Sequence, residues 1–524
     1  MASIPAVLQT NVRNEAQDLT ITTDVIEPVS LSQQMAVFTI PKKSDVLDSK
    51  SALKIRVAAA AGVTGAGGAA GTDISGKWLS GLLGHITAAR LFAGGQLLSE
   101  LRDAGHKIHL DKCFESQEFR ENYCDVKHGS CSEFRVAERV DQIPANGLAP
   151  AQSSASGSIR SVDAGHRASA FPYFRGIGTE AQNNGLEYFV LLEEIFPMLK
   201  DLQLPVRHLR DEVRIEIDFS QQPGDFLFQA GPSAGAVAPA ITVTDCVIFA
   251  DYIAYAPEVS AALEDTLMTT GVSIPYRQTA TMKQTIAGTT PQAALVSQTQ
   301  DILLGMEGRS VMKVYCAKQY ADTFTWATRG GVNVAQTYQG RCRSERLLGE
   351  SLQMVVNANQ IFDQPVVNGH EAYAYTSFAG EKPFCAYPDT WEYNGNYGGV
   401  APATDVLWST SSDGALDQTQ LGRQGDTAGS LTPVGYWKDG FMGTQNYIGV
   451  DLAKYSDGPD SPLNGMRIGA TPIILRLGWQ RGTSTGGAAG VADTRTNSPI
   501  SLTVFVEYLR MFELQAGAVS LRDM

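Results

Sequence analysis

The chain has 524 residues, of which 43% are hydrophobic and only 18% charged, and its formal net charge is −14. A length well beyond ~250–300 residues predicts two domains, each with its own core. The acidic balance argues against a nucleic-acid-binding protein, because contact with the phosphates needs clustered Lys and Arg. Low charge together with 51 glycines is typical of a β-rich chain with long irregular loops.

The cysteine content and the length of the apolar runs indicate in which compartment the protein is made. The seven cysteines are Cys113, Cys124, Cys131, Cys246, Cys316, Cys342 and Cys385. An odd, sparse set in a long chain predicts reduced thiols rather than a disulfide framework. No stretch approaches the ~18 apolar residues of a membrane-spanning helix, and the opening segment lacks the layout of a signal peptide. We therefore expect a protein that assembles inside a cell.

Four β-rich segments of the first half reappear in the same order in the second half. The pairs are "ALKIRVA" (52–58) with "VMKVYCA" (311–317), "LFAGGQLL" (91–98) with "VNANQIFD" (356–363), "EVRIEIDFS" (212–220) with "PIILRLGWQ" (472–480), and "VIFADYIAY" (247–255) with "VFVEYLRMF" (504–512). Their offsets are 259, 264, 260 and 256 residues, measured from Lys54 to Lys313, Gln96 to Gln360, Ile215 to Leu475, and Phe249 to Phe505. Four pairs at near-constant spacing predict a duplicated unit of about 250 residues.

Within these segments, apolar residues alternate with polar ones. In 212–220 the residues Val213, Ile215, Ile217 and Phe219 share one face, as expected of a strand that covers a core. The duplication places Leu475 at the same inward position as Ile215. Short strands separated by turn-rich stretches predict an all-β fold of two antiparallel units with few short helices.

Helices are expected at only a few places. Residues 94–110 and 116–124 are candidate helical insertions in the first unit, and 194–199 is a candidate single turn. A polar, helix-capable linker covers 255–266, and the second unit begins near 271–278. The predicted division is an N-terminal arm at 1–25, a first unit at 26–262 and a second unit at 263–524.

Long loops rich in Gly, Ala, Ser and Thr separate the strands. They cover 58–76, 146–158, 391–405 and 482–499. Loops of this length in compact domains are usually functional surfaces or locally disordered.

Three stretches resemble double jelly-roll major capsid proteins, most closely those of polinton-like viruses and virophages in the adenovirus-like lineage. In 171–220 an apolar strand, the turn "IFPML", a Leu-Pro step and an alternating strand follow one another. The stretch 350–375 is similar to the matching part of a second jelly roll, and 500–523 to a closing strand. The resemblance implies two tandem eight-stranded antiparallel jelly rolls.

The resemblance also implies a function. In that family three chains form a pseudo-hexameric homotrimer, and the trimers tile an icosahedral virus shell. Its expected partners are neighbouring trimers, penton and minor capsid proteins, and an internal membrane, without direct sequence-specific contact with nucleic acid. The location would be the virion capsid, assembled in the infected host cell. We expect no enzymatic activity and no cofactor, and we assign no catalytic or cofactor-binding residue.

One segment leaves metal binding open. Residues 105–131 contain the potential ligands His106, His109, Cys113, Cys124, His128 and Cys131. No tight Cys-x₂-Cys pair occurs among them, and the spacing fits no known zinc module. The favoured interpretation is surface histidines and buried cysteines beside the first jelly roll, and no metal ligand is assigned.

Four other segments partly match known motifs, but each is better interpreted as a loop than as a catalytic or binding site. "GTSTG" (482–486) matches a nucleophile pattern but lacks the helix that must follow it. "GAGGAA" (65–70) partly mimics a dinucleotide loop, also without its helix. The acidic segments 409–418 and 457–462 lack the ligand ladder of a calcium loop.

Two alternative functions remain for a tandem β-sandwich. A two-domain cupin enzyme would need a metal-binding His set, but the first unit offers His106 and His109 in a predicted helix, and the second only His370. A tandem carbohydrate-binding protein could stack sugars on loop aromatic residues. These residues are Trp391, Tyr393, Tyr397 and Trp408, and they could instead lie at trimer contacts, in loops that cap the outer face of the trimer.

Overall fold

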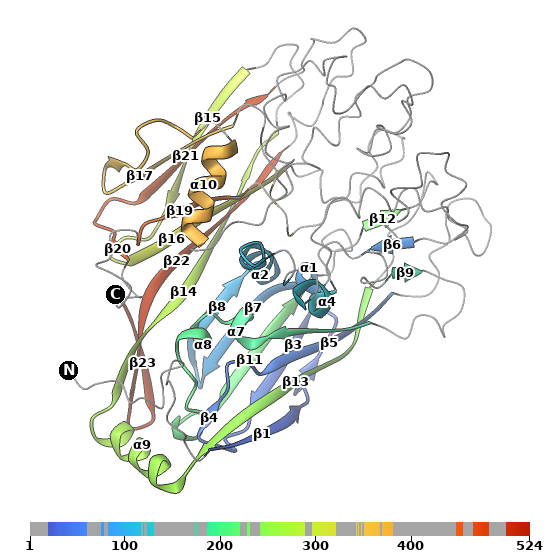
Figure 1. The fold of residues 1–524 in the computed structure, drawn as a ribbon, viewed down its shortest axis with the longest axis vertical. Helices are drawn as coiled ribbons and strands as arrows, with labels where there is room; N and C mark the ends of the chain where they lie inside the picture. Colours follow the sequence, from blue (N-terminus) through green and yellow to red (C-terminus); the bar gives the residue numbers. More distant parts are fainter. Residues whose placement is uncertain are drawn as a thin grey trace.

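The computed structural model of the chain describes residues 19–59, 75–77, 82–116, 119, 123–129, 173–175, 186–220, 228–230, 241–288, 296–320, 342, 344, 347, 350–366, 369–380, 447–453, 465–481 and 499–524. In these residues the chain is mostly β-strand, paired into antiparallel sheets (Figure 1). The predicted all-β class is confirmed.

The first jelly roll runs from β1 to β13 and is built from two sheets. One sheet has the order β1-β13-β5-β10, with β4 also paired to β13, and the other has the order β2-β3-β11-β7-β8. The bounds are β1 (Leu19–Ile26), β2 (Ser30–Leu31), β3 (Met35–Ile40), β4 (Val46–Leu47), β5 (Ala52–Ala59), β7 (Ile86–Ala93), β8 (Gln96–Arg102), β10 (Leu186–Leu191), β11 (Val213–Phe219) and β13 (Ile241–Tyr255). A small sheet of β6 (Ser75–Lys77), β9 (Tyr173–Arg175) and β12 (Phe228–Ala230) lies apart from these two.

The second jelly roll runs from β14 to β23 and repeats this plan. One sheet has the order β14-β22-β16-β19, with β20 paired to β16 and β23 to β22, and the other has the order β15-β21-β17-β18. The bounds are β14 (Val272–Ile286), β15 (Val296–Leu304), β16 (Ser310–Tyr320), β17 (Ser351–Val356), β18 (Asn359–Gln360), β19 (Ile448–Asp451), β20 (Met466–Arg467), β21 (Ile473–Arg481), β22 (Ile500–Gln515) and β23 (Ala518–Asp523).

The two units share one topology, which confirms the predicted duplication. In chain order, β1, β3, β5, β7, β8, β10, β11 and β13 take the same places in their sheets as β14, β15, β16, β17, β18, β19, β21 and β22. Ile215 in β11 pairs with Leu91 and Phe38, and Leu475 in β21 pairs with the corresponding Met354 and Ile302. Both Ile215 and Leu475 are fully buried, as predicted.

The register of two predicted pairs needs correction. The hairpin β7–β8 closes with Ala93 opposite Gln96, and the hairpin β17–β18 closes with Val356 opposite Asn359, so Gln96 corresponds to Asn359 and not to Gln360. Lys54 pairs with Val247 of β13, and its counterpart Lys313 pairs with Glu507 of β22. Equivalent positions of β13 and β22 are therefore 507 − 247 = 260 residues apart, and not the predicted 256. The segments 249–253 and 505–509 therefore lie in equivalent strands but are shifted by four residues in register.

Helices connect the strands within and between the two units. They are α1 (Leu82–His85), α2 (Ala104–Lys112), α4 (Asp125–His128), α7 (Leu192–Ile195), α8 (Met198–Asp201), the 3₁₀ helix η5 (Val206–His208), α9 (Pro257–Thr269) and α10 (Gly369–Gly380). The expected helix at 94–110 was half wrong: its first part is β8, because Gly94, with φ of 60°, turns the chain back onto β7. Of the expected helix 116–124, only residues 116, 119, 123 and 124 are described.

The predicted turn at 194–199 and the predicted linker at 255–266 are both helical in the structure. The single turn expected at 194–199 is two short helices, α7 and α8, divided at Phe196 and Pro197. The linker predicted at 255–266 is α9, which begins with Pro257 at a position where the missing N–H costs nothing. No helix in the described part of the chain is long and apolar enough to cross a membrane.

The N-terminal segment joins a sheet sooner than the predicted division suggests. Strand β1 begins at Leu19 and pairs with β13 along its whole length, from Leu19 opposite Tyr255 to Ile26 opposite Ile248. Residues 19–25 of the predicted arm are therefore part of the first jelly roll. Helix α9 spans the predicted boundary between residues 262 and 263.

The buried apolar residues fall into two clusters, and the first crosses the boundary between the jelly rolls. It contains Ile215 and its neighbours together with Ile274 and Tyr276 of β14 and Phe512 of β22. The second cluster lies between the sheets of the second jelly roll and also takes in Leu110 at the end of α2. Apolar burial therefore stabilises the two units jointly, at roughly 25 cal/mol per Å².

Candidate functional site

The junction between the jelly rolls gathers buried polar groups from both units. Strands β14 and β22 of the second unit pack against β8, α8 and α9 of the first (Figure 1). Helix α2 packs closely on α1, because Gly105 lies so close to the carbonyl oxygen of Leu83 that no side chain would fit there. We take this junction as the candidate functional site.

Lys107 of α2 is the central charge of the junction. Its Nζ lies 2.8 Å from Oε1 of Glu507 in β22, pairs also with Asp111, and sits 5.6 Å from the centre of the Tyr315 ring. Burial alone would lower the pKa of Lys107, but the carboxylates of Asp111 and Glu507 outweigh it and raise the pKa. The ammonium group therefore stays charged and ties the first unit to the second.

Glu507 pairs with Lys107 from β22, where its two neighbours in the strand, Val506 and Tyr508, are buried. Burial alone would raise its pKa, but Lys107 and Lys313 outweigh the effect of burial and hold the pKa well below its usual value. Lys313 is itself buried and faces Glu507 across the β16–β22 ladder. Both signs of charge are thus matched where water is largely absent, which is the condition for a buried ion pair to be tolerated.

A second set of contacts follows at the start of α2. His106 Nε2 lies 2.9 Å from the Tyr447 hydroxyl, and its ring stands edge-on to Phe505 at 5.5 Å. Asp103 Oδ2 lies 3.0 Å from Lys283 Nζ in β14 and 3.5 Å from His106 Nδ1. One turn of helix therefore contacts three separate segments of the second unit.

Strand β8 lies along β14 and bonds to it through side chains. The Gln278 amide donates to the Glu100 carbonyl at 2.7 Å and accepts from the Ser99 hydroxyl at 3.0 Å. The Tyr276 hydroxyl donates to the Leu98 carbonyl at 2.9 Å, and the Thr281 hydroxyl to that of Arg102 at 2.7 Å. These bonds satisfy carbonyls at the edge of the sheet that would otherwise lose their water on burial.

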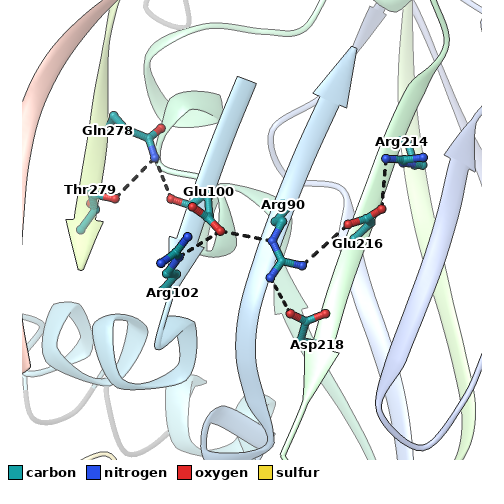
Figure 2. A network of polar contacts seen from close by, with 8 residues as sticks. All are labelled: Arg90, Glu100, Arg102, Arg214, Glu216, Asp218, Gln278 and Thr279. Atoms are coloured by element: carbon teal, nitrogen blue, oxygen red, sulfur yellow. Dashed lines mark hydrogen bonds and ion pairs between the residues drawn. The ribbon is translucent and has the colours of Figure 1, made fainter. Parts of the chain in front are cut away.

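An ion-pair network continues from β8 across the outer face of the first unit. Figure 2 shows Arg90 at its centre, with Nε 3.2 Å from Glu100, Nη2 2.8 Å from Asp218 and Nη1 3.7 Å from Glu216. Arg102 and Arg214 extend the network at its two ends. Burial tends to lower the pKa of Arg90, but Asp218 and Glu100 raise it. The network ties β8 to β7 and β11 of the same sheet.

The lower end of the junction is closed by α8 and the C-terminal hairpin. Asp201 accepts from the Arg277 backbone N–H at 2.8 Å and from Nη2 of the same arginine at 2.7 Å. In the hairpin β22–β23, Gly517 has φ of 77°, and its carbonyl accepts from the Arg210 N–H at 2.8 Å. The neighbouring Ala516 N–H donates to the Leu267 carbonyl of α9 at 3.0 Å.

The linker helix α9 is fastened to the first unit by one buried carboxylate. Asp45 accepts from the Ser260 hydroxyl at 2.8 Å, the Tyr255 N–H at 2.9 Å and Arg207 Nη1 at 3.2 Å. His208 Nε2 lies 3.8 Å away from the same carboxylate. Burial is the main cause of a lowered pKa for His208. The linker is therefore a bonded element of the first unit and not a free tether.

The potential metal ligands of 105–131 are occupied by other contacts. His106 bonds to Tyr447, and His128 Nε2 lies 3.4 Å from Glu194, which also pairs with Lys127 at 2.8 Å. The expectation of surface histidines was wrong, because His106, His109 and His128 are all buried. Cys113 and Cys124 are buried as expected, and Cys131 lies outside the described residues. Within the described ranges, no three His, Cys, Asp or Glu residues are grouped as a metal site would require.

Several sequence motifs lie outside the described part of the chain. They are most or all of 60–74, 146–158, 391–418, 457–462 and 482–498, including the aromatic residues of the proposed sugar-stacking loops. The junction residues, by contrast, were missed by sequence reasoning. A signal was present, because Glu507 and Lys313 each lie between two apolar residues of their strands.

The contacts at the junction hold the two jelly rolls in one fixed relation. Its charges are paired, and its hydrogen bonds connect backbone to side chain across the boundary. Elements α2, α8, α9 and β8 of the first unit contact β14 and β22 of the second, so relative motion of the units would break many contacts together. The arrangement sets the position of one jelly roll against the other.

Comparison with known proteins places this fold. No protein-family model matches the chain, and no curated protein matches it. Among solved structures, VP54 of PBCV-1, fitted into a reconstruction of the virophage Sputnik, is 11% identical, with a TM-score of 0.56 over 97% of each chain. A chain in the 3.5 Å structure of the Sputnik virophage is 12% identical, with a TM-score of 0.57 over 97% of this chain and 89% of that one.

A chain of the PBCV-1 virus capsid is 11% identical, with a TM-score of 0.55 over 97% of each chain. Sequence identities this low show only that the chains share a fold. The alignments extend over both jelly rolls and the junction between them, because almost the whole of each chain is covered. The chain has the double jelly-roll fold of viral major capsid proteins.

Proposed function

We propose that the chain is a structural major capsid protein that forms pseudo-hexameric homotrimers, which tile an icosahedral virus shell. The observation that carries the proposal is the pair of topologically identical jelly rolls held in one fixed relation by a buried polar junction. The fold shared with a chain of the PBCV-1 virus capsid supports it.

The duplication has a physical purpose in such a shell. Three chains with two similar units each present six similar units, so a threefold assembly can occupy a nearly hexagonal position in a lattice. This requires a fixed angle between the two units, because an error in angle would spread through every contact of the shell. The paired charges around Lys107 and the side-chain hydrogen bonds between β8 and β14 supply that rigidity.

The proposal extends to partners and location. The trimers would contact neighbouring trimers, penton and minor capsid proteins, and an internal membrane, and would reside in the virion after assembly in the host cell. A net charge of −14 supports a shell that makes no direct sequence-specific contact with the genome. The role is structural and not enzymatic.

The native mass of the purified chain tests the proposal. Light scattering on a sizing column should give about three times the chain mass of 56.2 kDa, and the value should persist on dilution. A monomer at every concentration would refute the capsid assignment and would make a glycan-binding screen for the carbohydrate-binding alternative the next experiment.

A further inference from the structure

Four of the seven histidines of the chain lie in the helices α1, α2 and α4. They are His85, His106, His109 and His128, and none of their side chains is more than 3% exposed. Helix α1 packs on α2, and the charge of Lys112, at the end of α2, lies near His128 of α4 (Figure 1). We call these four residues the histidine corner.

The strands of the two jelly rolls carry no histidine. This holds for every strand from β1 to β23 in the described part of the chain. Histidine is the side chain whose ordinary pKa, about 6.5, places its change of charge between about pH 5 and pH 8. Mild acid therefore adds positive charge to the helices of the histidine corner and not to the strands of the sheets.

His106 places one of these rings directly between the two units. Its Nε2 lies 2.9 Å from the Tyr447 hydroxyl, and its ring stands edge-on to Phe505 of β22. On the other side, its Nδ1 lies 3.5 Å from Asp103 Oδ2, which also lies 3.0 Å from Lys283 Nζ of β14. A proton on this ring would add a third charge where Asp103 and Lys283 already neutralise each other.

His128 lies beside two lysines and one carboxylate. Glu194 of α7 pairs with Lys127 at 2.8 Å and lies 3.4 Å from His128 Nε2. Burial is the main cause of a lowered pKa for His128, and Glu194 opposes it. Lys127 and Lys112 add to the lowering. The Tyr188 hydroxyl of β10, the strand on which α4 packs, stays neutral, because burial raises its pKa.

His85 ends α1 and lies against the core of the first unit. Its ring stacks on Phe219 of β11, with the ring centres 5.0 Å apart and the planes at 10°. Burial lowers the pKa of His85 to about 4. The ring is therefore neutral in the closed protein down to about pH 4, whereas an exposed histidine takes up a proton near pH 6.5.

We propose that the histidine corner is an acid-sensitive latch of the junction. At neutral pH its uncharged rings allow α2 to lie against the second jelly roll. In mildly acidic solution, proton uptake favours an open arrangement, in which water reaches the corner and α2 leaves β14 and β22 while the strands keep their pairing. The inference goes beyond the proposed function, because it adds a regulation of the joint that does not depend on the number of chains in the assembly.

The pKa of His85 sets how strongly acid favours the open arrangement. A histidine whose pKa is lowered in the closed state stabilises that state above pH 6.5, and the contribution is lost as the pH falls towards about 4. Opening restores the ordinary pKa, so His85 alone favours the open arrangement about 30-fold at about pH 5 and less than about twofold at about pH 7. His128 acts in the same direction. The pair of Lys107 and Glu507 responds only below about pH 4.3, so the two effects are separate.

Hydrogen exchange of the whole chain tests the proposal. Protection factors, corrected for the intrinsic pH dependence of exchange, are compared for α2, β11 and β21 at about pH 7 and about pH 5. In the wild type, α2 should lose protection by about tenfold or more at the lower pH, while β11 and β21 keep theirs. The loss should reverse when the pH is restored.

Two variants separate the histidine corner from other histidines. His85→Gln combined with His128→Gln removes the two rings of lowered pKa, and should restore about tenfold of the protection that α2 loses in acid. The matched control is His208→Gln. It removes a histidine whose pKa burial also lowers, but which lies in η5 beside Asp45, outside the corner. The control should leave the acid response of α2 unchanged, and circular dichroism at neutral pH checks that each variant folds.

Each outcome decides the proposal. Equal protection of α2 at both pH values in the wild type overturns it, whether or not the variants fold. A simultaneous loss in β11 and β21 also overturns it, because acid would then unfold the whole protein. A loss in α2 that the double variant leaves unchanged overturns the assignment to the histidine corner. A loss confined to α2, smaller in the double variant and unchanged in His208→Gln, supports the latch. The native mass is a separate measurement, so failure here leaves the proposed capsid function standing.

Discussion

Removing the central charge of the junction should destabilise the whole protein. Lys107→Met keeps most of the side-chain volume but leaves Glu507 without its 2.8 Å partner, and Asp111 without its own. Loss of one member of a buried ion pair costs about 3–5 kcal/mol, because the remaining charge keeps its desolvation penalty. Lys313, opposite Glu507 in the ladder, compensates in part, so we expect a value near the lower limit, about 3 kcal/mol.

The assay is urea unfolding followed by fluorescence and circular dichroism. The matched control is Lys43→Met, because the pair between Lys43 and Asp24 is exposed and should contribute no more than about 1 kcal/mol. The double variant Lys107→Met with Glu507→Gln should be less destabilised than the sum of the single variants, by about 0.5–3 kcal/mol. Additive effects would show that the two side chains do not interact.

The same pair predicts a dependence on pH. The folded-state pKa of Glu507 lies below its value in the unfolded chain, where it is about 4.3. Its stabilisation is therefore complete above that pH and is lost as the pH falls from there towards the folded-state pKa. Lys107→Met should flatten this part of the stability profile between about pH 4.3 and pH 2. An unchanged acid slope, with unchanged stability at pH 7, would refute the role of Lys107 as a tie between the units.

The remaining predictions concern the core and the closing contacts. Ile215→Ala and Leu475→Ala should each cost about 2–5 kcal/mol, since both side chains are fully buried at equivalent positions; unchanged melting temperatures would contradict the placement. Asp201→Ala should cost about 1.5–3 kcal/mol in urea unfolding, because two donors of Arg277 lose their acceptor. Asp301→Ala, at an exposed ion pair, is its control and should matter far less; equal losses would argue against the closing role of Asp201.

Much of the fold could be read from the sequence, because alternation of apolar residues reports burial directly. The alternating run at 212–220 predicted β11, and its counterpart predicted β21, with inward Ile215 and Leu475. Register was harder. Strands of similar composition match at several offsets, and only hydrogen-bond pairing fixed Lys54 opposite Val247.

Helix prediction failed where tertiary context decided. The residues of 94–110 suit a helix, but pairing with β7 makes 96–102 a strand, and only Ala104–Lys112 are helical. The junction could not be predicted for the same reason. Lys107 and Glu507 lie 400 positions apart in the sequence, and nothing local reveals that α2 lies against β22. The local signs were the charges of Glu507 and Lys313, each between two apolar residues of its strand.

In the proposed assembly, the two jelly rolls of each chain are fixed in one relation, and three chains form a ring of six. Electron microscopy of the purified oligomer tests it most directly. Class averages viewed down the particle axis should show a nearly hexagonal outline of six similar lobes with threefold symmetry. Particles with two lobes, or with two lobes at variable angles to one another, would contradict both the assembly and the rigid junction.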